Sequence, residues 1–149
     1  MKNTIITIVG IIALGGLLWW AGSFGENNPD VIATRGIHWH PELIIYVDGV
    51  KEDIPANIGL AGGHEPIHTH AEDVAQGVLH FEFGEIVRMD DTRLERFFEI
   101  WNKDIQTAFG FLERMTVNGE ENAEYGAYTV QEEDKIELFY VSAKEESGE

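Results

Sequence analysis

The sequence predicts an α+β protein in which an N-terminal transmembrane helix precedes a small mixed β-sheet packed on one helix. Three observations predict this class: an uncharged apolar segment near the N-terminus, several short runs of β-branched and aromatic residues between turn signals, and one stretch with helical apolar spacing. The 149 residues suffice for one domain besides the membrane segment. We expect a signal-anchor helix at residues 1–25, a linker at 26–35, an extracytoplasmic domain at 36–143 and a disordered acidic tail at 144–149.

The membrane segment runs from Thr4 to Phe24 without a charged residue, which is long enough to cross a bilayer core of about 30 Å as a helix. Lys2 precedes it and no Lys or Arg follows until Arg35, so the positive-inside rule places the domain outside the cytoplasmic membrane. A cleaved signal peptide is the alternative. The bulky WWAGSF end lacks a small-x-small cleavage site, which favours a retained, single-pass anchor in the cell membrane.

Short strands are predicted on both sides of one helix. Asp48-Gly49 is a two-residue hairpin signal, and a second turn is expected at Asn118-Gly119. A glycine-containing loop is expected at residues 58–66. The predicted strands are, in chain order, residues 42–48, 50–56, 67–71, 78–83, 113–118 and 135–142.

The helix is predicted to begin at Thr92, because Thr92-x-x-Glu95 is a capping-box pattern and Asp90 and Asp91 add negative charge at the positive end of the helix dipole. Gly110 is its expected stop. An apolar stripe follows helical spacing along this segment and is expected to pack against the sheet. The stripe consists of Leu94, Phe97, Phe98, Trp101, Ile105 and Ala108.

The element order of hairpin, extended segment, helix and two strands resembles a β-grasp (ubiquitin-like) arrangement. The C-terminal run VNGEENAEYGAYTVQEEDKIELFYV is similar to the closing strands of small β-grasp domains, in which a D-x-I precedes the last strand. The sulfur-carrier and conjugation chemistry of that family needs a C-terminal Gly-Gly. This chain ends Ser147-Gly148-Glu149, so that chemistry is not expected.

All six histidines fall between residues 38 and 80, and four of them form two His-x-His pairs. Residues i and i+2 of a strand point to the same side, so each pair offers two imidazoles about 7 Å apart on one face. Residues 78–83 alternate between apolar and polar, which places His80 on the less apolar face, away from the core. Neutral imidazole is the commonest protein metal ligand, so the cluster predicts a transition-metal site. The predicted ligands are His38, His40, His68, His70 and His80, with His64 peripheral.

The types of ligand atom in the chain limit which metals the site can hold. The chain has no cysteine, which excludes thiolate ligands and disulfides. Methionine occurs only at positions 1, 89 and 115, which does not favour a soft copper(I) site. Imidazole and carboxylate suit Zn(II), Cu(II), Ni(II) or Fe(II), and we expect copper or zinc. The acidic residues nearest in sequence, as fourth donors or outer partners, are Glu42, Glu65, Asp73 and Glu82.

Three functional classes remain open. We favour a metal-handling or sensing module without turnover. The second class is a metal-dependent enzyme with three histidine ligands and an open position, as in carbonic anhydrase. Residues 62–77 resemble the start of a cupin motif, but Val74 and Ala75 stand where that motif needs Glu, so we lean against an enzyme. The third is a non-metal cell-envelope interaction module in which the histidines act as a pH switch or are simply surface residues. The net charge of −17 excludes nucleic acid as a partner.

The histidine runs also carry a resemblance. HWHPELIIYVDG, IHTH and GVLHFEF, followed by RFFEIW, resemble a group of uncharacterised membrane-anchored extracytoplasmic proteins. Those proteins carry an H-x-H, an H-T-H-D, a G-x-x-H-x-E and an F-F-x-x-W in the same order. The resemblance spans residues 36–101, with Ala71 where the group has Asp. It implies that the histidines act as a unit, and it implies no particular reaction.

Overall fold

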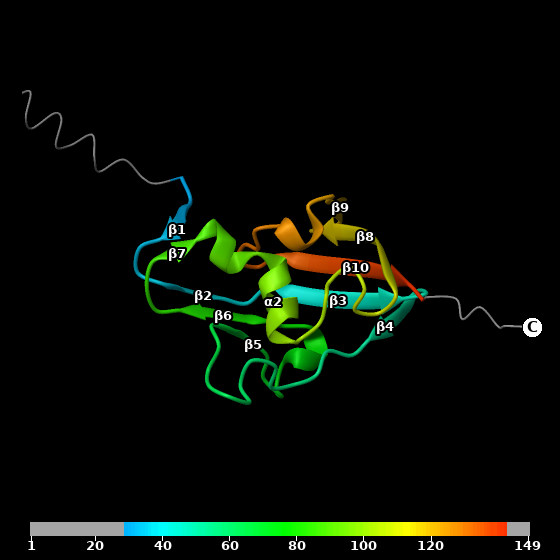
Figure 1. Cartoon of the computed structure of the whole chain (residues 1–149), viewed down its shortest axis with the longest axis horizontal. Coiled ribbons are helices and arrows are strands. Elements are labelled where there is room, and N and C mark those ends of the chain that lie inside the picture. Colours follow the sequence, from blue (N-terminus) through cyan, green and yellow to red (C-terminus); the bar gives the residue numbers. More distant parts are fainter. Residues whose placement is uncertain (1–28, 143–149) are drawn as a thin grey trace, which may run out of the picture.

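A computed structural model describes residues 29–142, which form a mostly-β domain with one short α-helix and mixed sheets (Figure 1). The predicted membrane segment and acidic tail lie outside these residues. Within the described range, no helix is long and apolar enough to cross a membrane. Three short 3-10 turns accompany the strands: η1 (Val74–Gln76), η2 (Met89–Thr92) and η3 (Tyr125–Ala127).

The largest sheet has five strands in the order β4-β3-β10-β8-β9. At its centre, β10 runs parallel to β3 and antiparallel to β8, so the sheet is mixed, as the sequence predicts. Its strands are β3 (Glu42–Val47), β4 (Val50–Glu52), β8 (Phe111–Val117), β9 (Glu120–Glu121) and β10 (Lys135–Val141).

Both predicted tight turns are confirmed, one joining β3 to β4 and the other joining β8 to β9. Asp48 and Gly49 have φ values of 49° and 83°, and Asn118 and Gly119 have φ values of 54° and 84°. Positive φ at both central residues is the type I′ pattern, whose twist matches that of paired strands. Asp-Gly and Asn-Gly adopt it at little steric cost, which is why the sequence signals this turn so clearly.

The helix α2 (Leu94–Ile100) begins later than predicted. Thr92 belongs to the preceding turn η2, and its hydroxyl donates to the Met89 carbonyl at 3.5 Å instead of capping α2. The predicted capping box at Thr92 is therefore wrong. The N-cap position is held by Arg93 without a side-chain cap.

The same helix ends one residue before Trp101, well short of Gly110. Asn102 adopts a left-handed conformation with φ of 58°. The N–H groups of Asn102 and Lys103 donate to carbonyls of the last turn, both at 2.9 Å. A left-handed residue with such bonds ends a helix as a glycine would, so the predicted stop at Gly110 is wrong.

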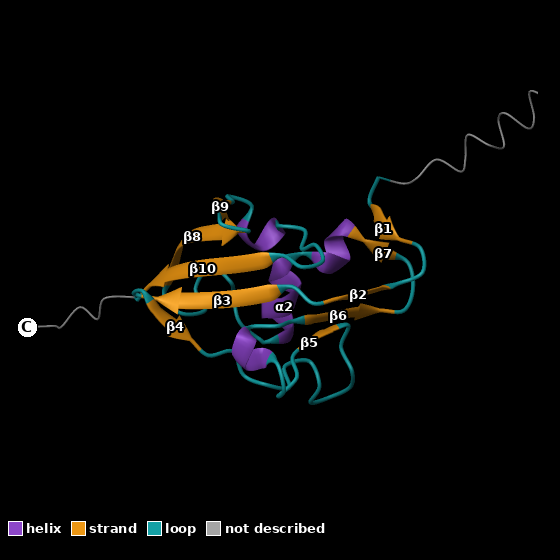
Figure 2. Ribbon diagram, turned by 180° about the vertical axis from the view of Figure 1, so that it is seen from behind, coloured by secondary structure: helices purple, strands orange, loops and turns teal. Residues whose placement is uncertain are grey.

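The helix lies across one face of the five-stranded sheet (Figures 1 and 2). The predicted apolar stripe packs into the core: Leu94, Phe97 and Phe98 are buried, and Ile105 is buried although it lies beyond the helix. The sheet contributes residues of β3, β8 and β10 to the same core, and they alternate along each strand except at a register shift on β8 between Leu112 and Met115. These are Leu43, Ile45, Leu112, Met115, Val117, Ile136, Leu138 and Tyr140.

A second sheet of three strands, in the order β2-β6-β5, extends from the end of the first sheet at which β3 begins (Figure 2). Its strands are β2 (Ile37–Trp39), β5 (Ile67–His68) and β6 (His80–Phe83). The third sheet pairs β1 (Val31–Ala33), within the predicted linker, with β7 (Val87–Arg88). The sequence predicted one sheet, because strands of two or three residues carry too little alternation to be recognised.

Candidate metal centre

The three-stranded sheet divides its side chains between two faces. Ile67 and Phe81 are buried in the hydrophobic core. The neighbouring positions point to the opposite face because side chains alternate along a strand. On that face, β6 is central: His80 pairs with His68 of β5, and Glu82 pairs with His38 of β2. Residues opposite one another in an antiparallel pair share a face, so the register brings the histidines of three strands together.

All six histidines of the chain form one continuous set of ring contacts on this face. His80 lies at the centre, with ring centroids 4.8 Å from His40, 5.4 Å from His68 and 4.6 Å from His70. His38 joins through His40 at 4.7 Å. His64 joins through His68 at 4.3 Å, so it lies within the cluster although the sequence placed it at the periphery.

Three overlapping groups of donor atoms in this set could hold a metal ion, and the atoms of each group lie within 4.8 Å of one another. The groups are His68, His70 and His80; His38, His40 and His80; and His64, His68 and Glu82. Each predicted ligand therefore belongs to at least one group. Of the four acidic residues considered from the sequence, Glu82 is a member, and Asp73 contacts His80.

The first group is the most buried and has donor spacing that suits one ion. The Nε2 atoms of His68 and His70 face one another at 3.1 Å. Two imidazoles bound to one tetrahedral zinc at about 2.0–2.1 Å hold their nitrogens about 3.3 Å apart. The Nδ1 of His68 lies 3.0 Å from the Glu65 carbonyl. A carbonyl only accepts, so Nδ1 carries the proton and Nε2 keeps its lone pair.

His80 is held in the complementary tautomer. Its Nε2 lies 2.8 Å from Asp73 Oδ2 and donates to that carboxylate, which leaves the lone pair on Nδ1. This Nδ1 is buried and has no hydrogen-bond partner, and neither has Asp73 Oδ1. His80 itself is 8% exposed. A buried polar atom without a partner costs about 1–3 kcal/mol, and a metal ion on Nδ1 would remove that cost. A carboxylate behind a metal-binding histidine is also the usual outer partner.

Thr69, between His68 and His70, anchors the backbone of this pair through two hydrogen bonds. Thr69 is fully buried, its hydroxyl donates to the Pro55 carbonyl at 2.9 Å and accepts from the Ile58 N–H at 3.1 Å. Both bonds hold the short segment against its neighbouring loop. The two imidazoles therefore project from a fixed backbone.

Burial lowers the pKa of His68, and the neighbouring imidazoles of His64 and His70 act in the same direction. The hydrogen bond to the Glu65 carbonyl and the charge of Glu82 oppose this shift. The net effect favours the neutral imidazole, which is the form that binds metal.

The second group combines the buried His80 with His38 and His40, which are exposed to solvent. The side chain of His38 is 62% exposed, and its Nε2 lies 3.0 Å from Glu82 Oε1. The same Glu82 oxygen lies 4.0 Å from His80 Nδ1. Glu82 therefore stands between the exposed and buried groups, a position that the sequence signals only by alternation on β6.

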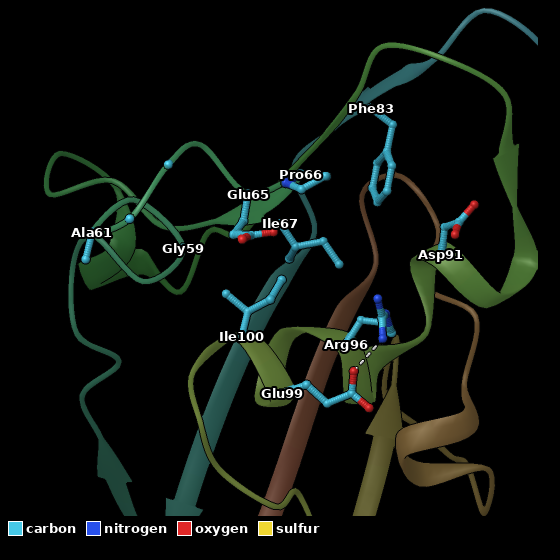
Figure 3. A pocket seen from close by; sticks show the side chains of 12 residues that line it. Gly59, Ala61, Glu65, Pro66, Ile67, Phe83, Asp91, Arg96, Glu99 and Ile100 are labelled. Carbon is cyan, nitrogen blue, oxygen red and sulfur yellow. Dashed lines mark hydrogen bonds and ion pairs between the residues drawn. The ribbon is translucent and has the colours of Figure 1, made fainter.

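A cavity of about 420 Å³ lies apart from the histidines (Figure 3). Ile67 and Phe83 line one side and Ile100 of α2 the other, with the Arg96–Glu99 ion pair at its edge. No histidine lines this cavity. Ile67 belongs to the core face of the three-stranded sheet, so the cavity and the histidine cluster lie on opposite faces.

Comparisons with family models, curated proteins and solved structures return no match to this chain. The fold and the site together define a mostly-β domain with histidine clusters that could hold a metal ion.

Proposed function

We propose that this chain is a membrane-anchored extracytoplasmic protein that binds copper or zinc through its histidine cluster, as a metal-handling or sensing module. One observation carries the proposal. The Nδ1 of His80 is buried without a hydrogen-bond partner, and the His80 ring contacts the rings of His68 and His70, whose Nε2 atoms face one another. Three neutral imidazole donors, two of them on β5 and β6 and one backed by Asp73, suit a borderline transition metal.

Membrane anchoring is supported by the uncharged segment from Thr4 to Phe24 and by its flanking charges. The net charge of −17 falls almost entirely after this segment. Such a charge keeps the domain away from anionic lipid headgroups and raises the local concentration of cations. Both effects suit a domain that binds metal ions on the extracytoplasmic side of the cell membrane.

A β-grasp-like build is supported by the five-stranded sheet, in which β3 and β10 pair in parallel at the centre and α2 covers one face. A three-histidine enzyme would need a substrate cavity at the open metal position. The cavity in Figure 3 has no histidine in its lining, so it lends that alternative no support.

The test is metal content of the full chain, purified in detergent without a polyhistidine tag and stripped with a chelator. After reloading with Zn(II) or Cu(II) and desalting, elemental analysis should find at least one ion per chain. The double variant His68→Ala/His70→Ala should lose the tightly held ion. The matched control is Glu120→Ala/Glu121→Ala, which removes two exposed carboxylates of β9 at the far sheet edge and should bind as the wild type does. Substoichiometric metal after repletion with both ions would refute the proposal.

A further inference from the structure

The histidine cluster contains more donors than one ion can use. Six imidazoles are in continuous contact, and two carboxylates adjoin them. Zinc takes four ligands in most protein sites. Every imidazole nonetheless belongs to one of three donor groups. A single ion would therefore leave several of these imidazoles without a metal to bind.

The shared members of the groups can each serve only one ion. His80 donates from Nε2 to Asp73 and has only Nδ1 left as a donor to metal. His68 donates from Nδ1 to the Glu65 carbonyl and has only Nε2 left. Both residues belong to the buried group with His70, so an ion there would use the one free nitrogen of each.

An ion in the buried group leaves His38 and His40 available. These two rings are in contact at 4.7 Å and are exposed. Glu82 Oε1 lies 3.0 Å from His38 Nε2, so Glu82 can supply the third donor that His80 no longer offers. A carboxylate with two imidazoles is a common donor set for zinc and copper(II).

We propose that the cluster is a two-ion centre, with one ion held by His68, His70 and His80 and a second held by His38, His40 and Glu82. This inference rests on the proposed function. The second ion binds more weakly because its two imidazoles are exposed to solvent, whereas His68 and His80 of the first group are buried. The His40 and His80 rings, one from each set, are 4.8 Å apart, so the two ions are near neighbours.

The two-ion centre is tested by titrating the metal-free full chain with Cu(II), again without a tag. Calorimetry with a competing chelator should resolve a tight and a weaker event, two ions in total. Electron paramagnetic resonance should show an isolated copper(II) signal after the first equivalent. Addition of the second should broaden or diminish that signal, because two nearby unpaired spins interact.

Two variants with substitutions outside the hydrophobic core separate the two sites. His38→Ala/His40→Ala should bind one ion with the first affinity unchanged and should keep the isolated copper signal at saturation. Glu82→Gln, which preserves shape, should weaken the second event by roughly tenfold or more and should change the first far less, because Glu82 only neighbours the first set of ligands. One ion per chain at saturation in the wild type overturns the two-ion centre while leaving the proposed function standing. No bound ion at all overturns both.

Discussion

Two carboxylates inside this domain, Asp134 and Asp73, differ in how completely their oxygens are hydrogen-bonded. Asp134 is 4% exposed, and both its oxygens accept bonds: from the Asn118 amide at 3.0 Å, from the Tyr128 hydroxyl at 2.8 Å and from one backbone N–H at 2.7 Å. Asp73 accepts one bond from His80, and its other oxygen is enclosed without a partner.

The contrast separates a structural polar cluster from a binding site. A fully satisfied network fixes the loop before β10 and offers nothing to a ligand. An unsatisfied buried group in a well-packed domain calls for an explanation such as a bound ion. The unpaired atoms are Asp73 Oδ1 and His80 Nδ1, and the His80 ring contacts three other histidine rings. The two clusters should therefore respond in opposite ways to metal and to mutation.

Metal should have the largest effect, and only through the histidine cluster. A ligand that binds the folded state alone at a thousand times its Kd stabilises that state by about 4 kcal/mol. We expect the free energy of unfolding in urea to rise by about this amount with saturating Zn(II). His68→Ala/His70→Ala should show little rise, and an equal rise in that variant would contradict the assignment.

Loss of Asp134 should have the next largest effect, on stability alone. Asp134→Ala removes the charged acceptor of three hydrogen bonds, which should lower the free energy of unfolding of the metal-free chain by about 3 kcal/mol. Asp134→Asn keeps one acceptor oxygen, so its free energy of unfolding should lie between those of the wild type and Asp134→Ala. Metal affinity, measured by chelator competition under conditions where the variant is folded, should stay within about twofold of wild type. A large loss of affinity would mean that the two clusters are coupled.

The sequence predicted the turns and the apolar stripe well because each depends on local chemistry. Asp48-Gly49 and Asn118-Gly119 need no distant contact to adopt type I′ turns. The D-x-I motif before the last strand contains Asp134. The sequence marks this residue, but only the fold shows that its hydrogen-bond partners include Asn118 and Tyr128. The helix end was mispredicted because any residue able to adopt positive φ can end a helix, and Asn102 does so here.

The histidine positions were visible in the sequence, but their convergence was not. Strand alternation alone put the paired histidines on one side of each strand. Bringing His68 opposite His80, and His38 opposite Glu82, required the register of very short strands. The selection of Asp73 over Glu42 required the turn at η1 to fold back on β6. Strand register and the position of η1 depend on tertiary structure, which the spacing of residues in the sequence does not predict.

Asp73→Asn should produce a moderate effect on metal binding and a small one on stability. The amide keeps the shape but loses the charge that favours metal on His80. Loss of such an outer partner typically lowers metal affinity 10–100-fold, or about 1.4–2.7 kcal/mol. The metal-free stability should change by less than about 1 kcal/mol, because the carboxylate has an unpaired oxygen to begin with. Stability losses as large as those of Asp134→Ala would instead make Asp73 a structural residue.

Acidification should have the smallest effect on the free energy of unfolding. It should act through the histidine cluster and not through the cluster around Asp134. Burial lowers the pKa of His68 below its ordinary value of 6.5, so between the folded and unfolded values the unfolded chain binds more protons. Stability contributed by neutral His68 is therefore present above about pH 6.5 and is lost as the pH falls through the folded value. Burial and Asp134 raise the pKa of Tyr128, so its hydroxyl stays protonated throughout this range. Urea unfolding with chelator from about pH 7.5 to 5.5 should show a steeper loss of stability for the wild type than for His68→Gln. Parallel curves would show that His68 is protonated equally readily in the folded and unfolded chains, and would remove the electrostatic reason for it to be a ready metal ligand.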